Sequence, residues 1–378
     1  MPIRKVILNL HLCAGLIAAV FLLLLGLSGS VLVFENQVDR AINGKLSWVP
    51  PDSHNLSLAD LKASLERGYP GYHVAAFSIS ERDDLAWSAF LDPPQPKGDG
   101  LGVAFNPHTG AVLGTDGDEN RLVNKVHQFH THLLAGQVGS EIMGWAGVFL
   151  LLLSLSGLIL WWPRKIFTVN RRSPSRRMIF DLHNAIGIYS SIFLLIFAAT
   201  GIVIHWEKLA STLANSITHS PSLQPVPRPE PAAPGAVPID PDRLLAIAAE
   251  AAPGARPTVL QLADSPARPV RIIMKYPEDH TPSGRTNIYL DSYSGKVLAA
   301  QVSRTAPVGF KITRMWNREI HTGDILGLPT QILACFVSLV LPMLAITGPL
   351  IWWTRRRKNP TLPAVTSSDD SRRFQTTA

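Results

Sequence analysis

Four stretches of this sequence contain no charged residue, and each is long enough to cross a membrane as a helix. A helix needs roughly 20 apolar residues to span the hydrocarbon core of a bilayer. The stretches have 23, 21, 20 and 29 residues, and they cover residues 12–34, 142–162, 185–204 and 325–353. The sequence therefore predicts a mainly α-helical membrane protein with four transmembrane helices in contact with the lipid bilayer.

Basic residues cluster in the short segments beside these stretches. Arg4 and Lys5 precede the first stretch, residues 163–178 contain six basic residues and no acidic one, and residues 355–358 follow the fourth. Because basic segments stay on the cytoplasmic side, both termini are predicted to be cytoplasmic and the two long loops to face outward, into the periplasm if the cell is Gram-negative and onto the outer surface if it is not. In a Gram-negative cell this predicts a multi-pass protein of the bacterial inner membrane with periplasmic loops. These clusters also account for the net charge of +7, so no nucleic-acid partner is predicted.

The chain divides at the ends of these helices. The predicted segments are a first transmembrane helix with a cytoplasmic N-terminus (1–34), a periplasmic module (35–139), a second transmembrane helix (140–163), a basic cytoplasmic loop (164–181), a third transmembrane helix (182–206), a Pro-rich linker (207–241), a second periplasmic module (242–324), a fourth transmembrane helix (325–354) and a cytoplasmic tail (355–378). The only cysteines, Cys13 and Cys335, lie in transmembrane stretches, so neither module is expected to contain a disulfide.

The first apolar stretch also has features of a cleavable signal peptide, with residues 27–30 as a small-residue cleavage site. Two observations favour an uncleaved helix. The apolar run is longer than the roughly 7–15 residues of a signal-peptide core. In addition, a small hydroxyl residue followed by glycine recurs in all four stretches, as Ser28-Gly29, Ser156-Gly157, Thr200-Gly201 and Thr347-Gly348.

The sequence aligns with itself in two blocks, which predicts two repeated halves. The matched pairs are His11/His183, Gly15/Gly187 and Gly29/Gly201 at an offset of 172 residues, and His130/His321, Gly157/Gly348 and Trp161/Trp352 at an offset of 191. In the long loops, residues 106–113 resemble residues 291–298, and both read as a strand, a turn and a returning strand. Helices are predicted at 59–65 and 243–251, so each long loop is expected to form a small α+β module.

Four of the twelve histidines occupy matching positions in the two blocks. His11 and His183 lie at the cytoplasmic ends of the first and third helices, whereas His130 and His321 precede the periplasmic ends of the second and fourth. An ionisable group near membrane depth is a functional candidate, and two imidazoles from different helices can ligate one iron. The pattern predicts two b-type haems, each with two histidine ligands, which favours electron transfer over oxygen chemistry.

Other histidines provide alternatives at the periplasmic end. His127 and His132 flank His130, so either His132 replaces it as the ligand or the three form a separate zinc or copper site. His130 and His132 would share a side only on a strand. His130 is preferred because it alone has a counterpart in the second half. His205 aligns with Val33 and is expected to be a pocket residue.

Small and aromatic residues accompany these histidines. Gly15 and Gly187 each follow a histidine by four residues, and they would either leave room for a macrocycle or let helices pack closely. The Trp-Trp pairs that end the second and fourth stretches are sufficiently explained as an aromatic belt. A propionate partner in Arg164 or Arg355 is the alternative.

These motifs resemble the PepSY-associated transmembrane family over nearly the whole chain. The motifs are Leu10-His11-x-x-x-Gly15, Phe129-His130, Leu182-His183-x-x-x-Gly187, Ile320-His321-Thr322-Gly323 and the turn at 291–298. Within that family the sequence looks most like the FoxB-type ferric-siderophore reductases. The resemblance implies haem ligation by His11, His130, His183 and His321, and an oxidoreductase that passes electrons to ferric siderophores in the periplasm.

The implied activity is reductive release of iron from the siderophore, because hard oxygen donors hold Fe(II) less well than Fe(III). Residues Arg314, Trp316 and Arg318 beside His321 are a possible docking surface for the chelate. No dinucleotide-binding fingerprint occurs, so electrons are expected from a membrane quinol or a cytoplasmic reductase. The main alternative is a membrane-anchored binding or sensor protein whose PepSY modules regulate a partner. A transporter is less favoured, because few polar residues lie within the spans.

Overall fold

The computed structural model describes residues 3–94, 100–115, 122–163, 165–170, 172–223 and 225–356. Within these ranges, four helices are long and apolar enough to cross a membrane. They are α1 (Ile3–Leu32), α6 (Gly136–Trp161), α7 (Ser175–His205) and α12 (Leu328–Arg356). Each contains most of one predicted apolar stretch, so the prediction of four apolar helices is confirmed. Several begin in polar sequence, because a helix can continue beyond the hydrocarbon layer.

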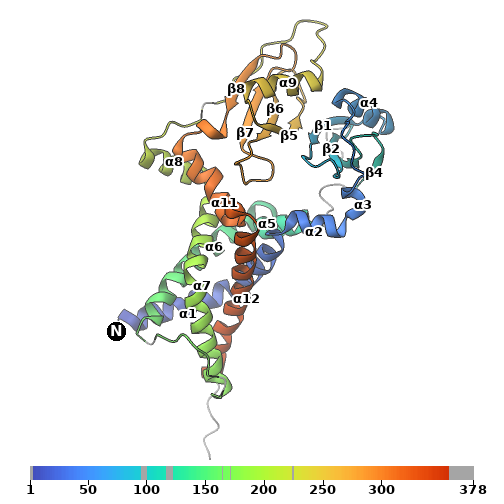
Figure 1. Cartoon of the computed structure of the whole chain (residues 1–378). Helices are drawn as coiled ribbons and strands as arrows, with labels where there is room; N and C mark the ends of the chain where they lie inside the picture. Colours follow the sequence, from blue (N-terminus) through green and yellow to red (C-terminus); the bar gives the residue numbers. More distant parts are fainter. Residues whose placement is uncertain are drawn as a thin grey trace, which may run out of the picture.

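The four helices form one bundle (Figure 1). Helix α1 packs against α6 and α12, and α7 packs against the same two helices, so α1 and α7 occupy opposite corners. Small and aliphatic side chains fill the centre, namely Ala18, Leu22, Leu150, Leu194, Ala198, Val337 and Leu341. Large apolar side chains such as Ile17, Val20 and Phe336 point outward and are exposed. This distribution suits helices whose outer faces contact lipid.

Short helices surround one end of the bundle, which we call the sheet end because the β-sheet lies beyond it (Figure 1). These elements are α2 (Glu35–Ile42), α3 (Gly44–Ser47), α5 (Leu122–His132), α8 (Glu207–Thr218), α10 (Val308–Phe310), the π-helical turn η3 (Lys311–Trp316), α11 (Asn317–Thr322) and the 3₁₀ turns η2 (Ser303–Thr305) and η4 (Asp324–Leu326). Helix α5 packs against α1 and α6, and α11 packs against α7 and α12. The chain termini of the bundle helices α1 and α12 lie at the opposite end, which we call the basic end.

The two long loops together build a single antiparallel sheet of eight strands. The first contributes β1 (His73–Ser78), β2 (Trp87–Asp92), β3 (Leu101–Phe105) and β4 (Val112–Thr115), and the second β5 (Arg256–Gln261), β6 (Val270–Lys275), β7 (Thr286–Leu290) and β8 (Val297–Gln301). The strand order is β4-β3-β2-β1-β5-β6-β7-β8, and the two sets join where Phe77 pairs with Leu260. Pairing β1 with β5 covers the strand edge that each set would otherwise expose.

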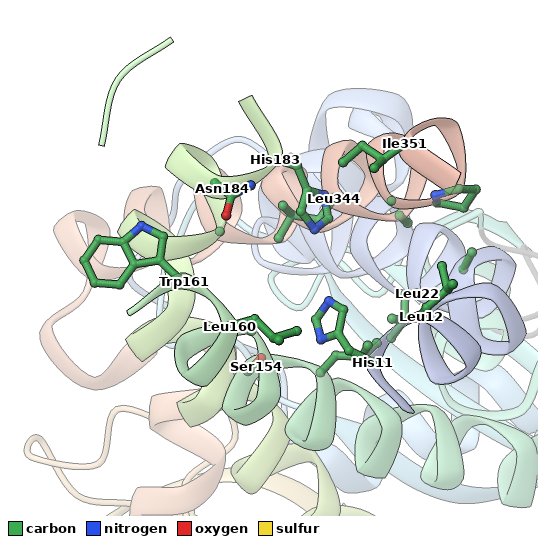
Figure 2. Close-up of a pocket in the computed structure, with 18 of the residues that line it drawn as sticks. His11, Leu12, Leu22, Ser154, Leu160, Trp161, His183, Asn184, Leu344 and Ile351 are labelled. Carbon is green, nitrogen blue, oxygen red and sulfur yellow. The ribbon is translucent and has the colours of Figure 1, made fainter. Parts of the chain in front are cut away.

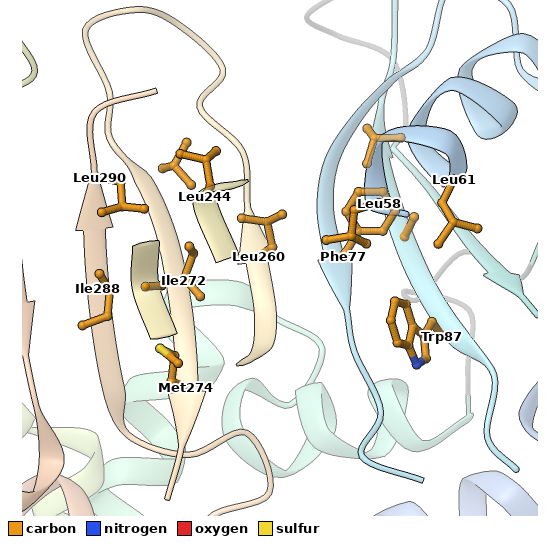
Figure 3. Close-up of a cluster of buried hydrophobic side chains, with 14 of the residues drawn as sticks. Leu58, Leu61, Phe77, Trp87, Leu244, Leu260, Ile272, Met274, Ile288 and Leu290 are labelled. Carbon is orange, nitrogen blue, oxygen red and sulfur yellow. The ribbon is translucent and has the colours of Figure 1, made fainter. Parts of the chain in front are cut away.

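One helix from each loop packs on this sheet, and the two share a hydrophobic core. Leu58 and Leu61 of α4 (Leu58–Gly68) and Leu244 of α9 (Pro241–Ala251) belong to the same buried cluster (Figure 3). The Asp242 carboxylate accepts hydrogen bonds from the backbone N–H groups of Leu58 (3.0 Å) and Ala59 (3.1 Å). The start of α9 therefore caps the start of α4 and ties the two loops together.

Two details differ from what the sequence predicted, and the structure decides a third that the sequence left open. The segment 207–241 was predicted to be a linker throughout, but it begins with α8, because its prolines start only at Pro221. The two predicted modules are joined in one sheet with one core, since β1 and β5 pair across them. His130 and His132 lie on helix α5 and not on a strand, so the two side chains point to different sides of the segment.

Candidate functional site at the two histidine levels

His11 and His183 line one cavity near the basic end of the bundle. They come from α1 and α7, the helices at opposite corners, and both rings point into the same space (Figure 2). The cavity has a volume of about 410 Å³ and is lined mainly by apolar side chains from all four long helices. A pocket of this size and character falls in the range of ligand and cofactor sites.

Gly15 and Gly187 also line this cavity, one turn from the two histidines. A Cβ added at Gly15 would lie 3.7 Å from Leu153, and one added at Gly187 would lie 3.9 Å from Leu344. These are ordinary contact distances, so neither glycine is required for close packing of helices. The glycines widen the cavity instead.

His130 and His321 form a second histidine pair at the sheet end. We call the His11/His183 pair and the His130/His321 pair the two histidine levels. They lie on the short helices α5 and α11, which pack on the ends of the long helices. Burial lowers the pKa of His130 to about 3, and the nearby His321 and His127 lower this pKa further. Burial, with a smaller effect of Arg318, lowers the pKa of His321 to about 4. Both imidazoles are therefore neutral near pH 7, the form in which a ring nitrogen can bind a metal.

Each of the four histidines bonds the hydroxyl residue of one Ser/Thr-Gly pair. The Nδ1 to hydroxyl oxygen distances are 2.8 Å for His11–Ser156, 2.8 Å for His130–Ser28, 2.8 Å for His183–Thr347 and 2.9 Å for His321–Thr200. The hydrogen bonds are reciprocal between helices. His11 of α1 bonds Ser156 of α6, and His130 of α5, the helix that precedes α6, bonds Ser28 of α1. The same exchange links α7 with α11 and α12.

The glycine of each pair lies next to the imidazole ring. A Cβ added there would approach the ring carbon Cε1 to 3.5 Å at Gly157, 3.3 Å at Gly29, 3.6 Å at Gly348 and 3.3 Å at Gly201. The contacts at Gly29 and Gly201 are the tighter ones. The sequence displayed these dipeptides as a recurring pattern but did not reveal that they contact the histidines. Only the crossing of the helices brings residues more than 100 positions apart together.

The three alternative histidines, His127, His132 and His205, have other partners. His127 Nδ1 is 3.8 Å from the Glu35 carboxylate, and the exposed His132 bonds Thr131 next to it. His205 packs edge-on against Trp206 and lies 3.6 Å from the Glu141 carboxylate. Among the described residues, no group of three or more His, Cys, Asp or Glu side chains is arranged to hold a metal ion. This geometry gives no support to a separate zinc or copper site.

Aromatic and basic residues close the cavity at the basic end. Trp161, Trp352 and Arg355 line it, whereas Trp162 and Trp353 are exposed. One tryptophan of each pair therefore faces the cavity and the other faces outward, a division that the aromatic-belt interpretation did not include. Arg164, the other predicted propionate partner, lies outside the described residues.

Arginines gather beside His321 at the sheet end. Burial and the neighbouring Arg318 lower the pKa of Arg285 to about 10. Arg314 pairs with Glu207, and Trp316 is exposed. Arg285 belongs to the loop between β6 and β7. The sequence predicted Arg314, Trp316 and Arg318 as a group, but it did not reveal that a loop of the sheet lies near them.

The helices and their apolar outer faces define a multi-pass membrane protein with an associated antiparallel sheet. The chain belongs to the PepSY-associated TM region family, whose model matches residues 8–355. This confirms the family suggested by the histidine motifs. No curated protein matches the sequence significantly.

Proposed function

We propose that this protein is an inner-membrane electron-transfer protein that holds two b-type haems and reduces ferric siderophores at the periplasmic face. The observation that carries the proposal is the arrangement of four histidines as two facing pairs at opposite ends of one bundle. His11 and His183 would hold one haem, and His130 and His321 the other. When bound, each haem would supply reversible one-electron exchange between Fe(III) and Fe(II).

The residues of the basic-end cavity fit a haem in three ways. The two imidazoles enter the cavity from helices at opposite corners, so His11 and His183 could both ligate the iron of one haem. The walls are mainly apolar, and Gly15 and Gly187 leave space beside the ligands. Arg355 at the edge can pair with a propionate, and Trp161 and Trp352 can pack against the ring.

The distance between the two levels fits transfer across a membrane. Ser28, which bonds His130, follows His11 by 17 residues on the same helix. At a rise of 1.5 Å per residue this corresponds to about 25 Å, close to the roughly 30 Å of hydrocarbon. The two histidine pairs would thus lie near opposite membrane surfaces, and neither level alone would carry an electron across.

The distribution of charge supports the proposed orientation in the membrane. The clusters of basic residues without acidic neighbours lie beside the helix ends that hold His11 and His183, namely Arg4 and Lys5, residues 163–178 and residues 355–358, which favours a cytoplasmic location for that end. The His130/His321 level and the sheet would then be periplasmic. The two crossed hydrogen-bond exchanges and the self-alignment also support two repeated halves, each of which contributes one ligand to each level.

The periplasmic reaction would transfer one electron to the Fe(III) of a siderophore and release Fe(II), which its oxygen donors hold poorly. The surface that includes Arg285, Arg314, Trp316 and Arg318 would dock the chelate next to His321. A quinol in the membrane or a cytoplasmic reductase would supply the electrons at the His11/His183 level.

The test is haem quantitation and visible spectroscopy of detergent-purified protein, oxidised and dithionite-reduced. We expect two low-spin b-type haems per chain. Single alanine substitutions of His11, His183, His130 and His321 should each lose the haem of their own level. The matched control is His73→Ala, an exposed histidine of the sheet. His127→Ala and His132→Ala should also retain both haems, and loss of haem from either would reassign the ligand.

Function is tested by reconstituting the wild type in liposomes with a reduced quinol and measuring Fe(II) released from a panel of ferric siderophores. We expect release that requires all four histidines. A colourless protein from haem-replete cells would contradict the proposal. It would favour the alternative of a membrane-anchored PepSY sensor, whose activity the four histidine substitutions should leave intact.

A further inference from the structure

The hydroxyls that bond the four histidines can only act as acceptors toward them. Each donates its own hydrogen to the carbonyl four residues earlier in its helix. The distances are 2.7 Å for Ser28 to Leu24, 2.6 Å for Ser156 to Leu152, 2.7 Å for Thr200 to Ile196 and 2.8 Å for Thr347 to Met343. A hydroxyl has one hydrogen and two acceptor lone pairs. With its hydrogen committed to the helix, it must accept from Nδ1 of the imidazole.

The protonation of the ring follows from this. A neutral imidazole carries one N–H, and here that hydrogen must be on Nδ1 to serve the hydroxyl. The other nitrogen, Nε2, then keeps its lone pair, which is the form that binds a metal. The same conclusion holds at four sites in four different helices, so a local accident of one side chain does not explain it.

We propose that Ser28, Ser156, Thr200 and Thr347 are positioning residues that hold the four histidines as Nδ1–H tautomers with Nε2 free to ligate iron. The inference rests on the proposed function for the identity of the metal group, but the tautomer itself is a property of the protein. It assigns a role to the hydroxyl residues that the repeated sequence pattern leaves unexplained.

The glycines complete the arrangement. The rings at Gly29 and Gly201 leave only 3.3 Å for an added Cβ, so a larger residue would require the imidazole to shift by a few tenths of an ångström. The distances of 3.5 Å at Gly157 and 3.6 Å at Gly348 leave ordinary contact space. Gly29→Ala and Gly201→Ala should therefore disturb haem binding more than Gly157→Ala and Gly348→Ala.

The hydroxyls are also expected to tune the iron. An Nδ1–H that donates a hydrogen bond makes its ring a stronger electron donor, which stabilises Fe(III). Removing the acceptor should therefore shift the reduction potential of that level to more positive values. Loss of such a partner typically weakens metal-group binding by roughly 10- to 100-fold.

The experiment uses Thr200→Val, which keeps the shape of the side chain but removes the hydroxyl, and Thr200→Ser, which restores it. Thr347→Val and Thr347→Ser repeat the test at the other level. The control is Thr354→Val on α12, because Thr354 makes the same bond to its helix carbonyl (2.9 Å) and, among the described residues, no hydrogen bond to a histidine.

Two readouts separate this inference from the proposed function. In haem-free protein, nitrogen-15 NMR of the imidazoles should report the Nδ1–H tautomer in wild type, Thr200→Ser and Thr354→Val, and a mixture at His321 in Thr200→Val. In haem-loaded protein, Thr200→Val should shift one of the two potentials to a more positive value, alter the electron paramagnetic resonance signal of that haem and weaken its binding about 10- to 100-fold.

The outcomes are distinct. An Nε2–H tautomer in wild-type apoprotein would overturn the inference, as would a Thr200→Val protein with wild-type potentials and spectra. A wild-type chain that binds no haem but holds all four rings as Nδ1–H would contradict the proposed function alone, and the positioning role of the hydroxyls would stand for another metal group. Rescue by Thr200→Ser shows that the hydroxyl is responsible, since a packing defect would not be repaired by a smaller side chain.

Discussion

The bundle and the sheet use apolar residues in opposite ways. In the sheet, large side chains such as Phe77, Phe105 and Leu290 are fully buried in a continuous core. In the bundle, the buried side chains are fewer, many large ones face outward, and the interior holds a cavity of about 410 Å³ next to two histidines. A water-soluble domain with such a cavity would lose stability, because voids remove packing contacts. The contrast agrees with the proposal that the bundle interior holds a cofactor, whereas the sheet is close-packed around its own side chains.

The largest effect is expected from filling the cavity of the bundle, which tests whether this cavity is the cofactor site. Gly187→Leu should place a side chain in the space beside His183, and we expect haem content to fall from two per chain to one. Gly187→Ala is the graded control, because its Cβ meets only an ordinary contact with Leu344 at 3.9 Å and should leave both haems bound. Haem quantitation checks the prediction, and two haems in the leucine variant would show that the cavity is not the cofactor site.

Removing a large side chain from the sheet core should destabilise the sheet and leave the haem content unchanged. Phe105 is 0% exposed and packs edge-on against Phe77. Phe105→Ala should destabilise the sheet by about 3–5 kcal/mol, since a fully buried aromatic ring is lost. Hydrogen exchange of the sheet amides measures this, while haem content should stay at two. Val112→Ala on β4, where the side chain is exposed, is the matched control. Equal protection in both variants would contradict the close-packed core.

The connection between α4 and α9 offers a smaller effect. Asp242→Ala removes the carboxylate that accepts two backbone hydrogen bonds at the start of α4. Loss of a helix cap costs about 1 kcal/mol, so the N-terminal amides of α4 should exchange faster while the sheet core stays protected. Asp264→Ala, which removes an exposed carboxylate paired with Arg268, is the control and should leave α4 unchanged.

The smallest expected effect concerns a surface ion pair of the sheet. The hydrogen bonds from Arg304 lower the pKa of Glu278 to about 2. Because the folded-state pKa is below its ordinary value of 4.5, any stabilisation by this pair is present above that ordinary value and is lost as pH falls toward 2. Both side chains are exposed, so the effect on unfolding should be slight. Carboxyl NMR titration should give a midpoint near 2 in wild type and a value returned toward 4.5 in Arg304→Ala. An unchanged midpoint in the variant would rule out the pair as its cause.

The sequence predicted those parts of the molecule that depend on residues near one another in the chain. The four apolar helices follow from continuous runs without charge, and helices α4 and α9 lie where 59–65 and 243–251 predicted them. The turn predicted within 291–298 separates strands β7 and β8. The family follows from histidine motifs within single helices. The haem ligands, the siderophore substrate and the periplasmic orientation stay predictions, because their evidence is chemical and awaits measurement.

Local pattern failed where a neighbour in space decided the outcome. His127, His130 and His132 occupy one short segment, and a strand or a helix would select different partners for them. The self-alignment favoured His130, and the structure adds that His130 bonds Ser28, which is distant in sequence. The same holds for Arg285, whose loop between two strands approaches the arginines beside His321 only after the sheet has formed.

Hydrophobicity, charge and the spacing of repeated motifs are properties of the chain itself, so the sequence alone determined that this protein has four membrane-spanning helices, basic segments beside them and two matched sets of histidines. The tertiary structure decided how those sets combine. Helix packing places α1 opposite α7 and brings each histidine within hydrogen-bond distance of a hydroxyl residue on a different helix. Strand pairing between β1 and β5 joins the two loops in one sheet. Both depend on surfaces that meet only when distant segments pack, because the contacts that stabilise them do not exist within either segment alone.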